Sequence, residues 1–140
     1  MKLKAVVMDT NIMVSIVISK EPNHKNAKAL ETKLKSEGLQ IVVPMTAVFE
    51  TICVFKRKKM EKAFDLSKQI DLQFIPVNID LAFLDTYYYN ELPYTKSGDL
   101  FLMAISKRLN IPLITEDKQL LKAARSISIN AFNILEYLEK

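Results

Sequence analysis

The sequence predicts an α/β fold built on a mainly parallel sheet. Short apolar segments of strand-like composition alternate along the 140 residues with longer segments of helical spacing, an order typical of parallel sheets covered by helices. The first apolar segment, Leu3 to Met8, is continuous, as expected of a strand buried on both faces. With two glycines and five prolines, the chain offers little material for linkers, so we expect one domain over residues 1–140.

The elements follow from apolar spacing and from turn and capping residues. Strands are predicted at residues 3–8, 39–43, 72–77, 111–115 and 128–132. Helices are predicted at residues 12–18, 22–37, 44–59, 60–70, 81–89, 97–109, 118–124 and 133–140. Gly38 is expected to end the second helix. Asp80 is expected to cap the helix that begins at Leu81, and Ser97 or Asp99 the helix that follows.

Composition narrows the class of protein. Hydrophobic residues make up 49% of the chain and charged residues 26%, the profile of a soluble globular protein. No apolar run approaches the ~18 residues that span a bilayer, and Asp9 and Asn11 interrupt the stretch that resembles a signal peptide, so we expect a cytoplasmic protein. The single cysteine, Cys53, lies in an apolar stretch and is expected to be a buried, reduced thiol. The net charge of +4 permits a nucleic-acid partner without requiring one.

Four of the sixteen acidic residues stand beside long apolar runs, where a solvated surface does not explain them. Asp9 follows AVVM, Glu50 lies inside VPMTAVFETICVF, Asp99 precedes LFLMAI and Asp117 follows PLITE. Burying an unpaired carboxylate is costly, so acids in core-like sequence require a reason. Ligands of open α/β sheets bind at the carboxyl ends of the strands, and Asp9 and Asp117 each follow a predicted strand. We therefore expect the four acids to converge in one cleft.

A structural role explains three of these acids when each is taken alone. Asp9 is then a turn or cap residue, and Asp99 and Asp117 are N-caps, whereas Glu50 lies in mid-helix, where capping cannot account for it. Taken together, the four favour a shared site. Converging carboxylates repel one another, and a divalent cation relieves that repulsion. An all-oxygen donor set favours Mg²⁺ or Mn²⁺ over zinc and suits phosphodiester hydrolysis.

Two other enzyme classes also place an aspartate after the first strand. A phosphatase of this kind would have a second acid two residues after Asp9, where Asn11 stands. A receiver domain would have an acidic pair before its phosphorylated aspartate and a lysine at a strand end, an arrangement that we cannot place in this sequence. Both patterns fit less well than the cluster of four acids.

The same residues resemble a known family. The blocks VVMDTNIMVS, TAVFET and GDLFLMAISKRLNIPLITEDKQLL are similar to PIN domains of the kind found in VapC-type toxins. The last block is the most specific, because an aspartate opens a helix that is followed by a strand and then by Thr-x-Asp. The resemblance covers essentially the whole chain and implies a single PIN-like nuclease domain over 1–140. The implied fold has three α/β/α layers and a central, mainly parallel five-stranded sheet with the first strand in the middle.

The resemblance also implies an activity, that of a metal-dependent endoribonuclease acting on single-stranded RNA. The catalytic, metal-binding acids of the family fall on Asp9, Glu50, Asp99 and Asp117, and the supporting polar positions fall on Thr10, Asn11 and Thr115. One or two Mg²⁺ or Mn²⁺ ions are implied, with Glu50 as a ligand or a water-orienting base. Hydrolysis would leave a 5′-phosphate and a 3′-hydroxyl. Glu116 competes with Asp117 for the last position, but the Thr-x-Asp spacing favours Asp117.

The resemblance further implies partners. VapC-type proteins usually form homodimers and are inhibited by a small antitoxin, so this chain is expected to be the toxin of a toxin–antitoxin pair. Two alternatives stay open: an RNA-processing nuclease outside such pairs, and an interaction module that has lost turnover. The complete acid set argues against the second alternative.

Several basic and aromatic residues could contact RNA near the acids. Lys96, beside Asp99, is the favoured phosphate contact, while the run Lys56 to Lys59 together with Lys62 is better explained as a solvated helix end. Aromatic rings can stack on unpaired bases, but tyrosines at helical spacing more often belong to a core or a dimer face; these residues are Tyr87, Tyr88, Tyr89 and Tyr94. His24 is expected at the surface.

Overall fold

The computed structural model describes residues 3–60 and 65–140, and within them it contains five strands and eight helices. The strands are β1 (Ala5–Met8), β2 (Gln40–Pro44), β3 (Phe74–Val77), β4 (Leu113–Ile114) and β5 (Ala131–Phe132). The helices are α1 (Thr10–Val17), α2 (His24–Ser36), α3 (Met45–Arg57), α4 (Leu66–Gln69), α5 (Leu81–Tyr87), α6 (Ser97–Leu109), α7 (Lys118–Ser126) and α8 (Ile134–Leu138). All strands pair in parallel, in the order β3-β2-β1-β4-β5. The predicted parallel α/β/α architecture with a central first strand is confirmed.

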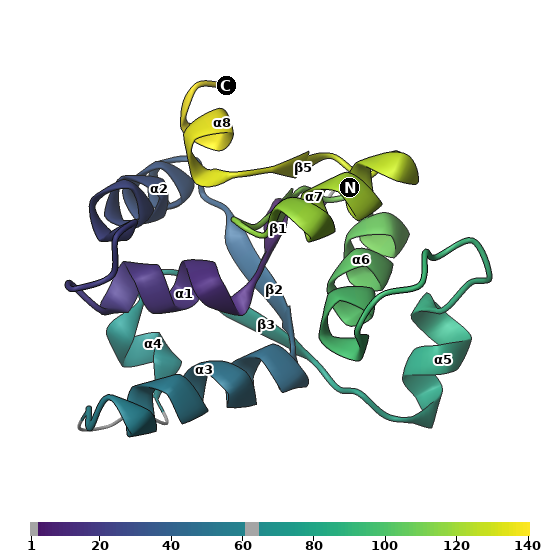
Figure 1. Ribbon diagram of the computed structural model, residues 1–140, viewed down its shortest axis with the longest axis horizontal. Helices are drawn as coiled ribbons and strands as arrows, with labels where there is room; N and C mark the ends of the chain where they lie inside the picture. The colour runs from purple at the N-terminus through teal and green to yellow at the C-terminus, as the bar shows by residue number, and fades with distance from the viewer. Residues whose placement is uncertain (1–2, 61–64) are drawn as a thin grey trace.

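The two faces of the sheet bury two separate cores. Side chains alternate along β1, so Val6 and Met8 pack in the core formed with α1, α2 and α8, whereas Ala5 and Val7 pack in the core formed with α6 and α7. Figure 1 shows α1 to α4 on one side of the sheet and α5 and α6 on the other. Because all four residues of β1 are buried, the apolar run at the start of the chain has no polar position until Asp9.

The strand order creates a cleft at one edge of the sheet. From β1 the chain adds β2 and then β3 on one side, and it later adds β4 and β5 on the other side. The connections therefore diverge between β1 and β4, which is where parallel sheets bind ligands at the carboxyl ends of their strands. Asp9 directly follows β1, and its backbone N–H donates to the Ile114 carbonyl of β4 over 3.1 Å. Asp117 follows β4 by three residues.

Some predicted elements need correction. The prediction of one helix from Met60 to Ile70 is wrong, because Met60 and Asp65 are not helical. Among the described residues of this segment, only α4 is helical. Residues 61–64, which include Lys62, lie outside the described residues. The capping residue of α6 is Lys96, which has an extended backbone, and not Ser97 or Asp99. Asp80 caps α5 as predicted and accepts from Phe83 N–H over 3.1 Å. Gly38 follows α2 with a φ of +70°, a conformation that favours glycine.

The expectation for Cys53 is also wrong. Its side chain is exposed, because it lies on the outer face of α3, opposite the residues that pack inward, Ala47, Thr51 and Phe55. The apolar run around Cys53 is amphipathic at helical spacing, and its average hydrophobicity hides the exposed positions. None of the helices in residues 3–60 and 65–140 has both the length and the apolar character needed to cross a bilayer.

Candidate active site

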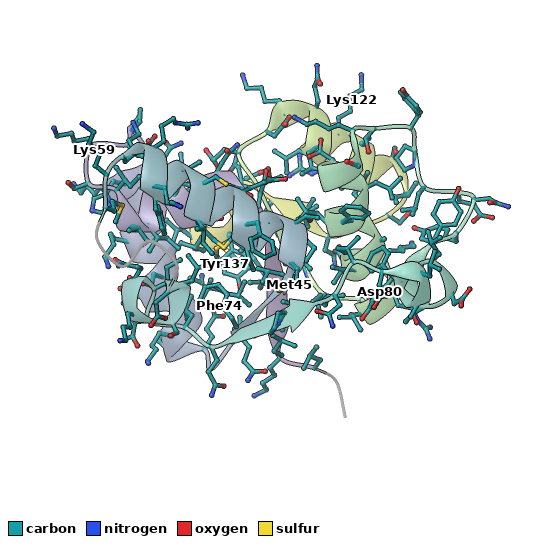
Figure 2. The ribbon with its side chains drawn as sticks, turned by 90° about the horizontal axis from the view of Figure 1, so that it is seen from below. Met45, Lys59, Phe74, Asp80, Lys122 and Tyr137 are labelled. Atoms are coloured by element: carbon teal, nitrogen blue, oxygen red, sulfur yellow. The ribbon has the colours of Figure 1, made fainter. Side chains whose placement is uncertain are left out.

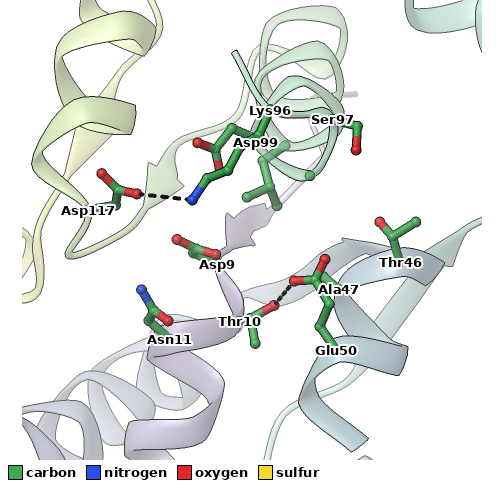
Figure 3. A pocket seen from close by; sticks show the side chains of 12 residues that line it. Asp9, Thr10, Asn11, Thr46, Ala47, Glu50, Lys96, Ser97, Asp99 and Asp117 are labelled. Atoms are coloured by element: carbon green, nitrogen blue, oxygen red, sulfur yellow. Dashed lines mark hydrogen bonds and ion pairs between the residues drawn. The ribbon is translucent and has the colours of Figure 1, made fainter. Parts of the chain in front are cut away.

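The four predicted acids line one pocket at the carboxyl edge of the sheet. The cavity holds about 350 Å³, and three of the four other predicted site residues, Thr10, Asn11 and Lys96, also line it, whereas Thr115 does not. Its lining residues are Asp9, Thr10, Asn11, Thr46, Ala47, Glu50, Lys96, Ser97, Gly98, Asp99, Leu102 and Asp117. Figure 3 shows that Asp9 lies between the start of α1, the start of α6 and Asp117. The fold thus brings together residues that are 108 positions apart in the chain, from 9 to 117.

Asp9 is held by a buried threonine. It occupies the N-cap position of α1, yet its side chain makes no capping hydrogen bond. Instead, Thr115 Oγ1 donates to Asp9 Oδ2 over 2.7 Å, and the same hydroxyl accepts from Asp117 N–H over 3.0 Å. Thr115 is completely buried, so this hydroxyl fixes Asp9 relative to the turn that carries Asp117. A capping role therefore does not explain why Asp9 stands at the end of β1.

Glu50 is held from the opposite side of the pocket. Thr10 Oγ1 donates to Glu50 Oε2 over 3.0 Å, which joins α1 to α3 (Figure 3). The other carboxylate oxygen, Oε1, faces the start of α6, where a side-chain carbon added at Gly98 would lie 3.5 Å from it. Thr10 thus makes a hydrogen bond of the kind that a supporting role requires. Glu50 is thus held by a hydrogen bond from α1 and lies beside the start of α6, both far from it in sequence.

Asp99 and Asp117 both stand at helix N-termini but are used differently. Asp99 lies in the first turn of α6 without capping it, so its carboxylate is available to the pocket. Asp117 is the N-cap of α7 and accepts from Gln119 N–H over 2.9 Å and Leu120 N–H over 3.2 Å, both through Oδ1. Its other oxygen, Oδ2, lies 4.0 Å from the Lys96 ammonium. Asp117 thus combines the predicted capping role with a place in the pocket.

Two of the predicted residues make weaker contacts with the acids. The Lys96 side chain is 74% exposed and reaches over the pocket to Asp117 (Figure 3). Asn11 is exposed at the rim and, among the described residues, its side chain forms no hydrogen bond to the acids. Asn11 therefore does not hold an acid in place, and its amide is free to contact a ligand.

The pocket carries more negative charge than its surroundings neutralise. Burial is the main reason that the pKa of Asp9 is raised above its ordinary value; the bond from Thr115 opposes this rise, and the charges of Asp117 and Glu50 add to it. Burial likewise raises the pKa of Asp99; Lys96 opposes the rise, and the other three acids add to it. Two shifted carboxyls facing two further acids are characteristic of a functional site.

Helix dipoles stabilise part of this charge. The N-termini of α1, α6 and α7 carry Asp9, Asp99 and Asp117 in their caps or first turns. A helix N-terminus has about half a positive charge, which favours a nearby anion. Helices α1 and α7 directly follow β1 and β4, and α6 precedes β4. The topology that collects the acids therefore also places three helix N-termini beside them.

The donor set fits a hard divalent cation. All four acids offer oxygen atoms to one pocket. Burial is the main cause of the raised pKa values of Asp9 and Asp99, and the charges of the neighbouring acids add to the rise. Within residues 3–60 and 65–140, however, no three His, Cys, Asp or Glu side chains are already gathered so as to surround one ion. Mg²⁺ commonly keeps several waters and uses one or two carboxylates, so the pocket suits such an ion better than a closed protein cage.

Five lining residues of the pocket were not assigned to the site from the sequence: Thr46, Ala47, Ser97, Gly98 and Leu102. Ser97 and Gly98 form the first turn of α6, and Thr46 lies at the start of α3. The Thr46 hydroxyl is buried and has no hydrogen-bond partner in the described part of the chain. The sequence signal was that Ser97 and Gly98 directly precede Asp99 and that Thr46 follows the second strand. Small polar residues are common at helix starts, so this signal did not single them out.

The other residues considered in the sequence analysis, Glu116, the basic run at the end of α3 and His24, lie outside the carboxylate pocket. Asp117 lines the pocket, whereas Glu116 does not and accepts from Ile134 N–H over 2.8 Å. Arg57 ends α3 and Lys58 is its C-cap. Both line a cavity that shares Thr10 and Asn11 with the pocket. Figure 2 shows Met45 and Lys59 at opposite ends of this helix. His24 is half-buried, and its Nδ1 lies 2.8 Å from the Ser15 carbonyl.

The tyrosines divide between core and surface. Tyr87 stacks on Phe83 with ring centroids 4.8 Å apart, and Tyr89 packs against the same core. Tyr88 is partly exposed, whereas Tyr94 is fully exposed. The expectation of a core role is therefore met by two of the four.

Comparison with known proteins identifies the family. The PIN domain family model matches residues 6–126, and no curated protein sequence matches the chain. Among solved structures, Mycobacterium tuberculosis VapC20, a Sarcin-Ricin loop cleaving toxin, is similar with a TM-score of 0.62 and 12% identity, covering 89% of this chain and 95% of that one. VapBC2 from Rickettsia felis, bound to a DNA fragment from their promoter, has a TM-score of 0.57 and 16% identity, covering 92% and 98%.

A third similar structure is archaeal. A PilT N-terminus domain protein from Sulfolobus solfataricus has a TM-score of 0.54 and 19% identity, covering 96% of this chain and 91% of that one. At these identities the likeness is one of fold. The family model, by contrast, extends over most of the chain and includes all four acids. This chain therefore belongs to the PIN domain family of nucleases, with the fold of its VapC-type members.

Proposed function

We propose that this protein is a metal-dependent endoribonuclease that hydrolyses phosphodiester bonds of single-stranded RNA, with residues 1–140 acting as one nuclease domain. The observation that carries the proposal is the convergence of Asp9, Glu50, Asp99 and Asp117 on one pocket. Membership of a nuclease family supports hydrolysis. Mg²⁺ or Mn²⁺ is the proposed cofactor, because four carboxylates offer oxygen ligands in one pocket.

Each side chain has a role that its contacts support. Asp9, Asp99 and Asp117 are the proposed ligands of the cation, with Glu50 as a further ligand or as the base that orients water. When bound, the cation supplies charge neutralisation, activation of the attacking water and stabilisation of the leaving oxygen. Thr115 and Thr10 keep two of the carboxylates in place through bonds of 2.7 Å and 3.0 Å.

Two residues at the rim are suited to the substrate. The amide of Asn11 is exposed beside Asp9, and the ammonium of Lys96 reaches the edge of Asp117. A lysine contributes a positive point charge that attracts a phosphate, so Lys96 is the proposed phosphate contact. Without such a charge, the four acids would repel the RNA backbone.

The test is cleavage of a single-stranded RNA by the purified protein. We expect cleavage with Mn²⁺ or Mg²⁺, none with EDTA, and products with a 5′-phosphate and a 3′-hydroxyl. Asp9→Asn should abolish cleavage, whereas Asp85→Asn, at an exposed position of α5, is the matched control and should cleave normally. A folded wild-type protein that leaves RNA intact in the presence of Mn²⁺ would refute the proposal and favour an idle interaction module.

We also propose that the protein is the toxin of a toxin–antitoxin pair, forms a homodimer and acts in the cytoplasm. Similarity to a VapC toxin and to the VapBC2 complex supports this assignment. An RNA-processing nuclease outside such pairs is the alternative. Expression of the chain alone should arrest cell growth if it is a toxin, and co-expression of a short neighbouring reading frame should restore growth. Normal growth with active enzyme would favour the alternative.

A further inference from the structure

A second cavity adjoins the carboxylate pocket on the side of the loop that connects α5 to α6. It holds about 390 Å³ and is lined by Tyr94, Thr95, Lys96, Asp99, Gln119 and Ala123. Lys96 and Asp99 also line the carboxylate pocket, so the two cavities are neighbours that share a wall. A strand held at the carboxylates can therefore continue over Lys96 into the second cavity.

The chemistry of this second cavity differs from that of the acid pocket. The ring of Tyr94 is fully exposed, although nearly all other aromatic rings of the described chain are at least partly buried. A large ring in open solvent offers a free face, and every nucleobase can stack on such a face. Ala123 is small and leaves room beside the ring.

Gln119 supplies the polar group that a base edge requires. Its side chain is exposed and forms no hydrogen bond with the described residues. An amide can both donate and accept, which allows it to pair with the edge of a base. Its backbone N–H is bound to Asp117 Oδ1 over 2.9 Å, so the position of Gln119 is tied directly to one of the four acids.

We propose that this cavity binds one unpaired nucleobase of the substrate strand, next to the phosphate that is cleaved. Tyr94 stacks on the base, Gln119 reads its edge, and Lys96 lies at the boundary with the cleavage site. This inference rests on the proposed nuclease function. It goes beyond that function because it names the residues that determine which base lies next to the cleaved phosphate. It also explains the preference for single strands, since a paired base cannot leave its stack to reach Tyr94 without an energetic cost.

The cavity on the other side of the site does not compete for this role. It shares Thr10 and Asn11 with the acid pocket and contains Arg57 and Lys58, and none of its described lining residues is aromatic. Its basic groups can contact phosphates, but its lining offers no aromatic ring on which a base could stack. The base is therefore assigned to the Tyr94 side.

The experiment combines kinetics with a binding measurement that needs no cleavage. The probes are a single-stranded RNA dodecamer with one cut site and the same RNA carrying 2-aminopurine beside the cut. Tyr94→Ala should raise KM roughly 5- to 150-fold, as expected for the loss of one stacked base, with kcat little changed. Tyr94→Phe should retain a KM near that of the wild type, because the ring face is preserved. In EDTA, the wild type and Tyr94→Phe should quench the 2-aminopurine fluorescence, and Tyr94→Ala should not.

Gln119 is tested by the choice of cut site. When a pool of random single-stranded RNA is cleaved, Gln119→Ala should alter which base flanks the cut. Tyr88→Ala is the matched control, because Tyr88 is also an exposed tyrosine but lines a different cavity. This variant should match the wild type in KM and in cut sites. Circular dichroism verifies that each variant is folded.

The outcomes separate the two proposals. If the wild type cleaves RNA while Tyr94→Ala and Gln119→Ala behave like Tyr88→Ala, the base subsite is wrong and the nuclease function stands. If the folded wild type cleaves no RNA with Mn²⁺, the proposed function fails and the subsite fails with it. A rise in KM for Tyr94→Ala that Tyr94→Phe does not reverse would assign the effect to the phenolic hydroxyl and overturn stacking.

Discussion

Replacing Asp9 with asparagine should stabilise the fold at neutral pH while abolishing cleavage. The Asp9 carboxylate is largely buried among Asp117 and Glu50, and its pKa is raised, with burial as the largest cause. Asparagine has nearly the same shape, and its amide oxygen can accept the bond that Thr115 Oγ1 now donates over 2.7 Å. The substitution therefore removes a buried negative charge and keeps the hydrogen bond.

The size of the effect follows from the cost of the buried charge. Each pKa unit by which the folded state raises a carboxyl destabilises its ionised form by about 1.4 kcal/mol. Single stabilising substitutions in natural proteins commonly add about 0.5–2 kcal/mol. We therefore expect Asp9→Asn to raise the free energy of unfolding by about 1–2 kcal/mol at pH 7. For a domain of this size, each kcal/mol raises the melting temperature by about 3–4 °C.

The gain should depend on pH in a defined direction. The pKa of Asp9 is higher in the folded state than the 3.8 of an unperturbed aspartate, so the contribution of Asp9 to stability is fully present below pH 3.8 and is lost as the pH rises through the folded pKa. Asparagine does not titrate. The difference between variant and wild type should therefore be largest at pH 7 and disappear near pH 3.5.

The assay is urea unfolding followed by circular dichroism, in EDTA, from pH 3.5 to pH 7. Asp85→Asn, which removes an exposed carboxylate from α5, is the control and should change stability by less than about 0.5 kcal/mol. Addition of Mn²⁺ should stabilise the wild type by mass action and the Asp9→Asn variant much less. A variant that is less stable than the wild type at pH 7 in EDTA, or a gain that does not vary with pH, would refute the reasoning.

Three further substitutions test other parts of the site and the fold. Thr115→Val removes a buried hydroxyl that donates to Asp9 and accepts from Asp117 N–H. The substitution should lower the free energy of unfolding by about 1–3 kcal/mol. It should also move the acidic limb of the pH–rate profile to higher pH, because the hydrogen bond that lowers the pKa of Asp9 is lost. Glu50→Gln keeps an acceptor for Thr10 but loses the charge, and should reduce kcat by about 10²- to 10⁴-fold while RNA binding in EDTA, measured by fluorescence anisotropy, persists. Asp80→Ala removes the cap of α5 and should lower stability in urea by about 0.5–2 kcal/mol; reduced cleavage by this variant would show that α5 influences the site.

Most strands and helices could be predicted from the sequence, because local composition and apolar spacing determine them. The run Ala5–Met8 is buried on both faces of the sheet, so its composition alone indicates a strand inside a parallel sheet. Helix α2 repeats apolar residues at helical spacing and is followed by a glycine with positive φ. The failures were local as well: Cys53 lies on the outer side of an amphipathic helix, and α6 begins one residue after Lys96 because its cap is chosen by backbone geometry and not by side-chain type.

The sequence marked the four acids by their unsuitable surroundings, since a carboxylate beside core residues is costly wherever the chain folds. It could not show that Thr115 bridges Asp9 and Asp117, that Thr10 orients Glu50, or that Tyr94 and Gln119 line a cavity beside Asp99. Those relations join residues up to 106 positions apart. They exist because β4 returns to the side of β1 that β2 leaves free. The composition of a segment shows whether its residues will be buried. Which distant residues become neighbours depends on the order of the strands, and that order arises only when the whole chain packs.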